Sequence, residues 1–228
     1  MSDPTVVFDL DGTLIDTAPD LVETLNVVFR QEGLNPLPFE DARALIGGGA
    51  RRMIERGLQA EQRSCAKEDI DRLFANFIAY YSDHIADGSR PFPGLETALD
   101  HLAREGSRFA VCTNKFEGLS VKLLHALGLQ HRFAAICGQD TFGVQKPDPQ
   151  VLWRTIDEAG GRREHAVMVG DSATDVKTAR AAGIPMIAVD FGYTEIPAAL
   201  LGADRVISSF EMLPAAVFDL LPGVFPAR

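Results

Sequence analysis

The segment Thr-Val-Val-Phe-Asp-Leu-Asp-Gly-Thr, residues 5–13, decides the fold of this chain. Its first four residues are a short apolar run rich in β-branched side chains, which is typical of a strand buried on both faces of a parallel sheet. The run stops abruptly at Asp9-Leu10-Asp11-Gly12, where the glycine permits a tight turn. Further short apolar runs of this kind predict strands at residues 109–112, 134–137, 166–169, 186–189 and 205–207.

Segments of helical length lie between these strands. We expect helices over residues 94–104, 119–127, 149–159 and 173–182. Gly128, Gly160 and Gly183 follow the last three directly, and glycine just past a helix end is the usual left-handed stop. Alternating strands and helices build right-handed βαβ units. The sequence therefore predicts an α/β fold with a doubly wound, Rossmann-like parallel sheet.

Residues 17–88 interrupt this alternation. They contain no convincing strand, whereas helical patterns occur from about Pro19 and over residues 42–46, 51–58 and 67–84. In the first of these patterns Leu21, Leu25 and Val28 fall on one helical face. We therefore predict a discontinuous α/β core domain of residues 1–16 and 89–228. An inserted α-helical domain of residues 17–88 would divide it.

Composition restricts the possible partners. The chain has 228 residues, 46% of them apolar, and its 32 acidic and 22 basic side chains give a net charge of −10. An acidic globular protein of this kind is a poor partner for the phosphate backbone of nucleic acids. The sequence shows no signal peptide, no membrane span and no cysteine pattern of a disulfide or zinc site. We expect a cytoplasmic monomer or homodimer without nucleic-acid or membrane partners.

Polar residues follow the predicted strands at their carboxyl ends. Asp9 and Asp11, Thr113, Asp171 and Asp190 all occupy such positions. Ligands of open α/β sheets bind outside these strand ends, so we expect the side chains to converge on one rim. Two carboxylates two residues apart in an extended segment point to the same side. One of them can attack a phosphorus centre while the other handles a proton.

A second acidic pair lies at a strand-to-helix junction. Asp171 and Asp175 are four residues apart, which places them on one face if the helix has begun. Together with Asp9 they offer an all-oxygen site, and hard oxygen ligands favour Mg²⁺. The alternative is that Asp171 or Ser172 only caps the helix, which explains one acid but leaves Asp175 unexplained.

Thr113, Asn114 and Lys146 supply donors and positive charge. Thr113 and Asn114 offer a hydroxyl, an amide and backbone N–H groups near a helix start, which suit phosphoryl oxygens. Lys146 precedes Pro147 and the helix that begins near Pro149. A lysine held there can neutralise both a phosphate and an attacking carboxylate.

Four motifs in this order resemble those of the haloacid dehalogenase superfamily of phosphohydrolases. They are DLDGT (9–13, with Leu10), CTN (112–114), QKPDP (145–149) and GDSATD (170–175), and the resemblance covers essentially the whole chain. The helical insert resembles that family's α-helical cap domain. Within it, Ile46-Gly47-Gly48-Gly49-Ala50 followed by Arg51 resembles the cap loop of the phosphoglycolate phosphatase branch.

The resemblance implies a Mg²⁺-dependent phosphatase that hydrolyses a small phosphomonoester, with 2-phosphoglycolate the best single candidate. Asp9 would be the nucleophile that forms an aspartyl-phosphate, and Asp11 the general acid and base. Asp9, the Asp11 backbone carbonyl and Asp171 would hold the metal, with Asp175 farther out, acting through water or pointing toward Lys146. Thr113 and Lys146 would be catalytic as well as substrate-binding. The other expected substrate-binding residues are Asn114, Gly47, Gly48 and Arg51.

Other functions remain open on the sequence alone. A sugar-phosphate phosphatase, a pyrophosphatase or nucleotidase, and a phosphoglucomutase-like enzyme share the scaffold. A non-catalytic regulatory or interaction module could use the same fold. The Gly47–Gly49 loop could also be a flexible turn beside solvated arginines.

Overall fold

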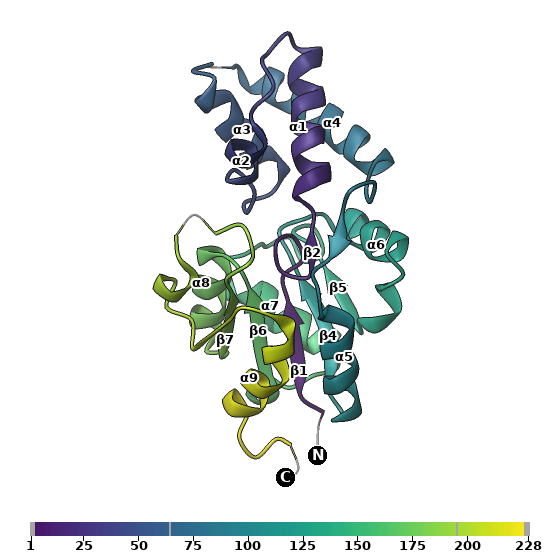
Figure 1. The fold of residues 1–228 in the computed structure, drawn as a ribbon, viewed down its shortest axis with the longest axis vertical. Helices are drawn as coiled ribbons and strands as arrows, with labels where there is room; N and C mark the ends of the chain where they lie inside the picture. Colours follow the sequence, from purple (N-terminus) through teal and green to yellow (C-terminus); the bar gives the residue numbers. More distant parts are fainter. Residues whose placement is uncertain (1–2, 64, 195, 226–228) are drawn as a thin grey trace.

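The computed structural model describes residues 3–63, 65–194 and 196–225. Within these residues, six strands form one parallel sheet in the order β5-β4-β1-β6-β7-β8 (Figure 1). The strands are β1 (Thr5–Phe8), β4 (Arg108–Cys112), β5 (Ala135–Cys137), β6 (Ala166–Gly170), β7 (Met186–Val189) and β8 (Arg205–Ile207). The sheet confirms the predicted fold class, and it places β1 between β4 and β6 at its centre.

Apolar clusters cover both faces of the sheet. Val6 and Phe8 of β1 join the cluster on one face, whereas Val7 between them joins the cluster on the other. On the first face lie α5 (Leu95–Arg104), α6 (Glu117–Ala126) and α9 (Leu213–Leu220); on the second lie α7 (Pro149–Glu158) and α8 (Ala173–Ala182). Burial on both faces explains why the strands are continuous apolar runs rather than alternating ones.

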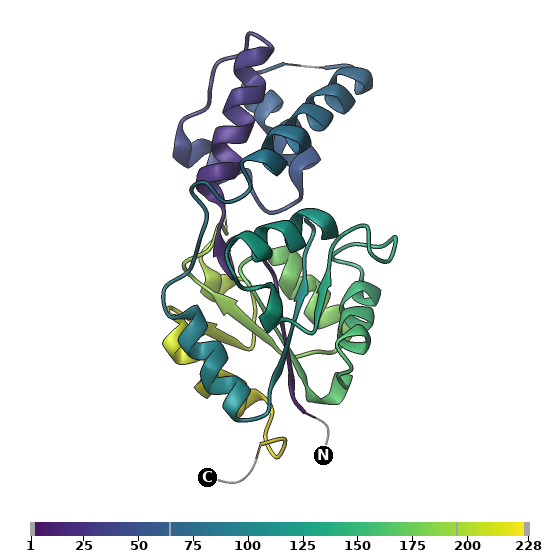
Figure 2. The same ribbon diagram turned by 90° about the vertical axis from the view of Figure 1, so that its right-hand side faces the viewer.

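The insert lies beyond the carboxyl ends of the strands (Figures 1 and 2). It comprises α1 (Ala18–Gln31), α2 (Phe39–Arg43), α3 (Ala50–Ala60) and α4 (Lys67–Asp83). Both α1 and α3 pack against α4, and Leu25, Phe29, Ile54 and Phe77 are fully buried there. The division of the chain at residues 17 and 88 into two domains stays a prediction.

Some elements had no counterpart in the sequence analysis. β2 (Ile15–Asp16) and β3 (Arg90–Pro91) form a short antiparallel pair at the base of the insert. Strands of two residues carry no alternation that a sequence could reveal. Helix α9 is apolar almost throughout, so it lacks helical periodicity. Short 3₁₀ helices occur at Gln130–Arg132, Arg163–His165, Ala198–Leu200 and Phe210–Met212. Among the described helices, none combines the length and hydropathy needed to cross a membrane.

Asp20 joins the two places where the chain passes between insert and core. Its buried carboxylate, near the start of α1, accepts hydrogen bonds from the backbone N–H of Gly88 (2.7 Å) and of Ser89 (2.8 Å). It also accepts one from the hydroxyl of Ser89 (2.5 Å). The entry and the exit of the insert are therefore held together by one charged side chain.

We predict that Asp20→Ala lowers the free energy of unfolding by about 2–4 kcal/mol, because it leaves buried N–H groups without an acceptor. Chemical denaturation measures this change. The matched control is Asp83→Ala, at the exposed end of α4, which should shift stability by less than about 0.5 kcal/mol. Equal effects of the two substitutions would contradict the role assigned to Asp20.

Candidate active site

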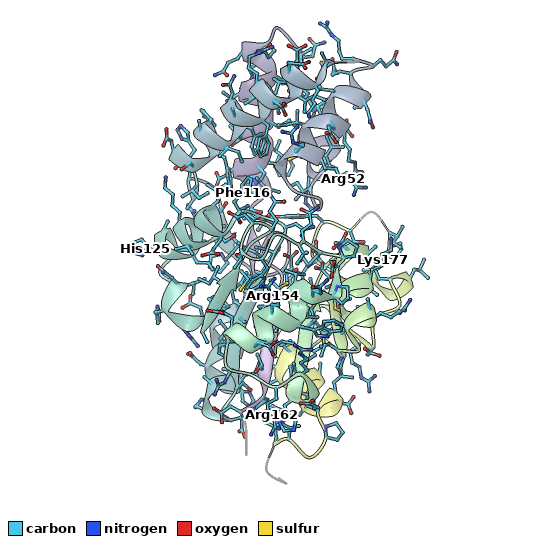
Figure 3. The ribbon with its side chains drawn as sticks, turned by 180° about the vertical axis from the view of Figure 1, so that it is seen from behind. Arg52, Phe116, His125, Arg154, Arg162 and Lys177 are labelled. Atoms are coloured by element: carbon cyan, nitrogen blue, oxygen red, sulfur yellow. The ribbon has the colours of Figure 1, made fainter. Side chains whose placement is uncertain are left out.

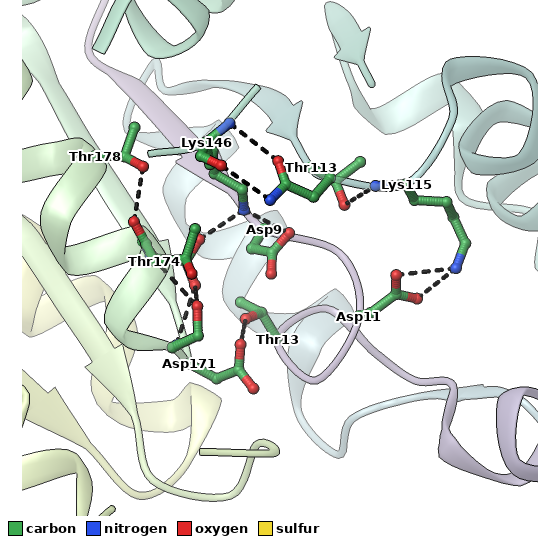
Figure 4. A network of polar contacts seen from close by, with 12 residues as sticks. Asp9, Asp11, Thr13, Thr113, Lys115, Lys146, Asp171, Thr174 and Thr178 are labelled. Carbon is green, nitrogen blue, oxygen red and sulfur yellow. Dashed lines mark hydrogen bonds and ion pairs between the residues drawn. The ribbon is translucent and has the colours of Figure 1, made fainter. Parts of the chain in front are cut away.

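The structure brings three strand ends together at the base of the insert. Asp9 follows β1, Thr113 follows β4 and Asp171 follows β6, and these strands are neighbours in the sheet. The backbone N–H of Asp9 donates to the carbonyl of Val169 (2.9 Å), and that of Thr113 donates to Cys137 (3.0 Å). These bonds continue the ladders one residue past the strands, so the sheet positions Asp9 and Thr113, whose side chains are labelled in Figure 4.

Lys146 lies at the centre of this site. Only 3% of its surface is exposed, and its Nζ is 2.8 Å from Oδ1 of Asp9 and 2.6 Å from Oδ1 of Asp175. Burial lowers the pKa of Lys146, but the carboxylates of Asp175 and Asp9 outweigh that effect, so the pKa lies above its usual value. A permanent positive charge therefore stands between two buried acids.

Asp171 is enclosed by close contacts. It accepts hydrogen bonds from the backbone N–H of Tyr193 (2.7 Å) and from the hydroxyl of Thr13 (3.4 Å). Gly12 and Gly192 pack against it so tightly that a Cβ on either would lie within 2.5 Å of an Asp171 atom. Gly12 also has a φ of +80°, a conformation that favours glycine. Both glycines are therefore needed to shape the wall of the site.

Among the described residues, Asp9, Asp171 and Asp175 form an acidic cluster whose carboxylate oxygens lie within 4.8 Å of one another. Burial, together with the neighbouring carboxylates, raises the pKa of Asp171 well above its usual range. Burial also raises the pKa of Asp9 to about 6, although Lys146 opposes the shift. Buried carboxylates that repel one another this strongly fit a site for a divalent cation.

Asp175 contacts Lys146, as one of the two predicted arrangements has it, and it also has a capping role that the sequence analysis did not identify. Ser172 is the N-cap of α8, and Oδ2 of Asp175 accepts hydrogen bonds from its N–H (3.0 Å) and its hydroxyl (2.6 Å). This reciprocal capping box explains Asp175 without a metal. Because its other oxygen contacts Lys146, both oxygens of Asp175 already have partners. Asp9 and Asp171 are left as the better candidates for direct metal ligands.

Asp11 points away from the acidic cluster (Figure 4). Its two oxygens lie 2.7 and 2.9 Å from Nζ of Lys115, and Oδ1 also accepts from the hydroxyl of Thr17 (2.8 Å). Lys115 is buried, and its ammonium lies 4.6 Å from the centre of the Tyr81 ring. Sequence reasoning missed Lys115, although it is the first charged residue after β4 at this rim.

Thr113 and Asn114 are placed differently from each other. The hydroxyl oxygen of Thr113 accepts from the N–H of Lys115 (3.2 Å), which leaves its proton free for a ligand. The side-chain amide of Asn114 accepts from the N–H of Lys146 (3.0 Å) and donates to its carbonyl (3.1 Å). Asn114 therefore holds the backbone of Lys146 in place.

A small cavity of about 60 Å³ lies between the carboxyl ends of the central strands and the insert. Its wall combines predicted site residues with apolar side chains of the insert: Asp9, Asp11, Thr113, Asn114, Lys146, Gly47, Gly49, Leu21, Ile46, Met53, Phe77 and Tyr81. Ser172 and Thr174 reach it from α8. The insert thus covers the charged rim with an apolar roof.

Other predicted positions lie beside this cavity. Gly48 and Arg51 line a neighbouring hollow with Arg52 and Phe116, two residues that Figure 3 places at the boundary between insert and core. The guanidinium of Arg51 pairs with Asp71 (2.6 Å) and lies over the Phe74 ring. Asp190, another strand-end acid, is exposed and accepts from the hydroxyl of Ser208, outside the site.

The raised pKa of Asp9 predicts how stability depends on pH. Because that pKa moves from 3.8 to about 6 on folding, the ionised carboxyl destabilises the folded state, and stability is lost as pH rises between these values. In EDTA, Asp9→Asn should therefore be more stable than the wild type at pH 7, by roughly 3 kcal/mol. The difference should vanish near pH 4.

Denaturant unfolding of both proteins across this pH range tests the expectation. Asp190→Asn, the same substitution at an exposed strand end, is the control and should change stability little at any pH. A wild type that is more stable than Asp9→Asn at pH 7 in EDTA would contradict the prediction.

The sequence of this chain is similar to those of known proteins. Residues 6–189 match the sequence model of the haloacid dehalogenase-like hydrolases. The chain is 48% identical to a phosphoglycolate phosphatase of Mesorhizobium japonicum, over 97% of each chain. It is 45% identical to one of Agrobacterium fabrum, over 96% of this chain and 94% of the other.

Solved structures agree in fold. A crystal structure titled as a predicted phosphoglycolate phosphatase from Haemophilus somnus superposes with a TM-score of 0.86 at 25% identity, over 95% of this chain and 98% of that one. CbbY from Rhodobacter sphaeroides, crystallised with phosphate, has a TM-score of 0.80 at 26% identity, over 96% and 100% of the chains.

Proposed function

Because the chain belongs to the haloacid dehalogenase-like hydrolases, we propose that it is a Mg²⁺-dependent phosphatase that hydrolyses 2-phosphoglycolate through an aspartyl-phosphate. The observation that carries the proposal is the placement of Asp9. Its carboxylate lies at the end of the central strand, beside the buried ammonium of Lys146 and the acid Asp171. The choice of 2-phosphoglycolate as the substrate is supported by the relatives named phosphoglycolate phosphatase.

The reaction needs two carboxylates with separate roles. In the first step an oxygen of Asp9 attacks phosphorus, the bond from phosphorus to the ester oxygen breaks, and Asp11 gives that oxygen a proton. In the second step Asp11 takes a proton from water, which attacks the phosphorus of the aspartyl-phosphate. Inorganic phosphate leaves and Asp9 is regenerated. This is nucleophilic catalysis combined with general acid–base catalysis.

Charge is the main obstacle to the first step. A carboxylate 4 Å from a phosphate oxyanion is repelled by roughly 4 kcal/mol per charge pair at an effective dielectric constant near 20. Lys146 offsets part of this repulsion because its ammonium contacts Asp9 directly. The free proton of the Thr113 hydroxyl supplies a donor for a transferring oxygen.

The residues present fit a Mg²⁺ ion. Asp9 and Asp171 would hold it, because the Lys146 ammonium offsets only part of the negative charge of the three clustered carboxylates. When bound, the ion supplies positive charge that draws together the phosphate and the attacking carboxylate. The Asp11 backbone carbonyl as a further ligand stays a prediction.

The cavity favours a small substrate. A volume of about 60 Å³ under an apolar roof is far below that of pockets that hold drug-sized ligands. Contacts from Gly47, Gly48 and Arg51 to the substrate stay predictions. A cytoplasmic location and a monomeric or homodimeric state stay predictions as well.

A steady-state assay with 2-phosphoglycolate and Mg²⁺ tests the proposed activity. We expect turnover by the wild type and a loss of about 10⁴-fold or more in Asp9→Asn, since that variant lacks the nucleophile. Asp190→Asn is the matched control and should keep the wild-type rate. Absence of turnover in the wild type, or full activity in Asp9→Asn, would exclude the mechanism.

Metal binding makes a separate prediction. Mg²⁺ should raise the melting temperature of the wild type at pH 7, because a ligand that binds only the folded state stabilises it. Asp171→Asn should abolish this increase, and Asp190→Asn should keep it. An equal increase in all three proteins would place the ion elsewhere.

A further inference from the structure

Lys115 is a second buried ammonium in the site, and the mechanism above gives it no role. It lies in the loop after β4, is 8% exposed and lines the same cavity as Asp9 and Lys146. Its Nζ contacts both oxygens of Asp11. Asp11 cannot reach the leaving oxygen of a substrate while both of its oxygens remain in this pair.

Tyr81, in the last turn of α4, brings an unused donor to the same place. It is 1% exposed and lines the cavity, and its ring covers the ammonium of Lys115 at 4.6 Å. Its hydroxyl is buried and, among the described residues, has no acceptor for its proton. Burial raises the pKa of Tyr81 to about 12, which keeps the hydroxyl protonated. A buried donor without an acceptor is costly, so an acceptor on a ligand would relieve that cost.

The position of these two groups relative to Asp11 suggests what they bind. Asp11 must meet the ester oxygen that leaves the phosphorus. In a 2-phospho-substituted acid, one carbon separates that oxygen from the carboxylate. A cation that contacts Asp11 therefore stands beside the carboxylate end of such a substrate, whereas Lys146 stands at the phosphoryl end beside Asp9.

We propose that Lys115 and Tyr81 form the subsite for the substrate carboxylate. The carboxylate accepts from the ammonium of Lys115 and from the hydroxyl of Tyr81, and it replaces Asp11 as the counter-ion of the lysine. Asp11 is then free to turn to the leaving oxygen. This inference rests on the proposed phosphatase activity, and it needs no contact from Arg51, whose guanidinium is paired with Asp71.

The test compares a carboxylated ester with a neutral one of similar size, 2-phosphoglycolate against ethyl phosphate, in Lys115→Met and Tyr81→Phe. In Lys115→Met, kcat/KM for 2-phosphoglycolate should fall by about 100-fold, as expected for loss of a charged partner. In Tyr81→Phe it should fall by about 10-fold. The ratio of kcat/KM for 2-phosphoglycolate to kcat/KM for ethyl phosphate should fall by at least these factors, because ethyl phosphate has no carboxylate to bind the two groups.

Lys122→Met is the matched control. Lys122, on α6, also contacts α4, through a hydrogen bond that it donates to Ser82 (2.8 Å), but it does not line the cavity. The kcat/KM values for 2-phosphoglycolate and for ethyl phosphate should both stay within about 2-fold of the wild type in this variant. Circular dichroism and denaturant unfolding show separately whether each variant is folded.

Equal losses on both esters in Lys115→Met would overturn the inference, because they would show that Lys115 only positions Asp11. Unchanged selectivity in Lys115→Met, or a selective loss in Arg51→Ala instead, would overturn it as well. Failure of the proposed function would look different: the wild type would then turn over neither ester.

Discussion

The structure depends on the confinement of buried negative charge at the end of the central strand. Asp9, Asp171 and Asp175 lie within reach of one cation, and the ammonium of Lys146 bridges two of them. Repulsion among the three buried carboxylates has to be offset in the folded protein. The capping box of Asp175 and the backbone N–H that Tyr193 donates to Asp171 offset part of it within the protein.

Polar contacts connect this site to the insert. The hydroxyl of Tyr193 donates to Asp16 (2.6 Å) and accepts from the N–H of Ala18 (2.9 Å), so the loop that holds Asp171 also holds the start of α1. On the opposite side, Lys115 joins Asp11 to Tyr81 of α4. Helices α1 and α4 of the insert are therefore tied to both acidic segments.

Much of this arrangement is predictable from the sequence. Strands buried on both faces are continuous apolar runs, and glycines end the helices, so the sheet and its helices could be placed. Polar residues at the carboxyl ends of the strands then indicated which end of the sheet holds the site. Contacts between distant segments could not be found in this way. The pairing of Lys115 with Asp11, and that of Tyr193 with Asp171, depends on how loops fold over the rim. The capping box of Ser172 and Asp175 was missed because Ser172 was considered as a helix cap without Asp175 as its reciprocal partner.

The central claim is that Asp9 carries the phosphoryl group during turnover. Rapid acid quench of the enzyme during a single turnover of 2-phosphoglycolate, followed by peptide mass spectrometry, measures this directly. We expect a transient phosphoryl group on Asp9, formed before phosphate is released and absent in Asp9→Asn. Release of phosphate in a single turnover without any phosphoryl group on Asp9 would contradict it.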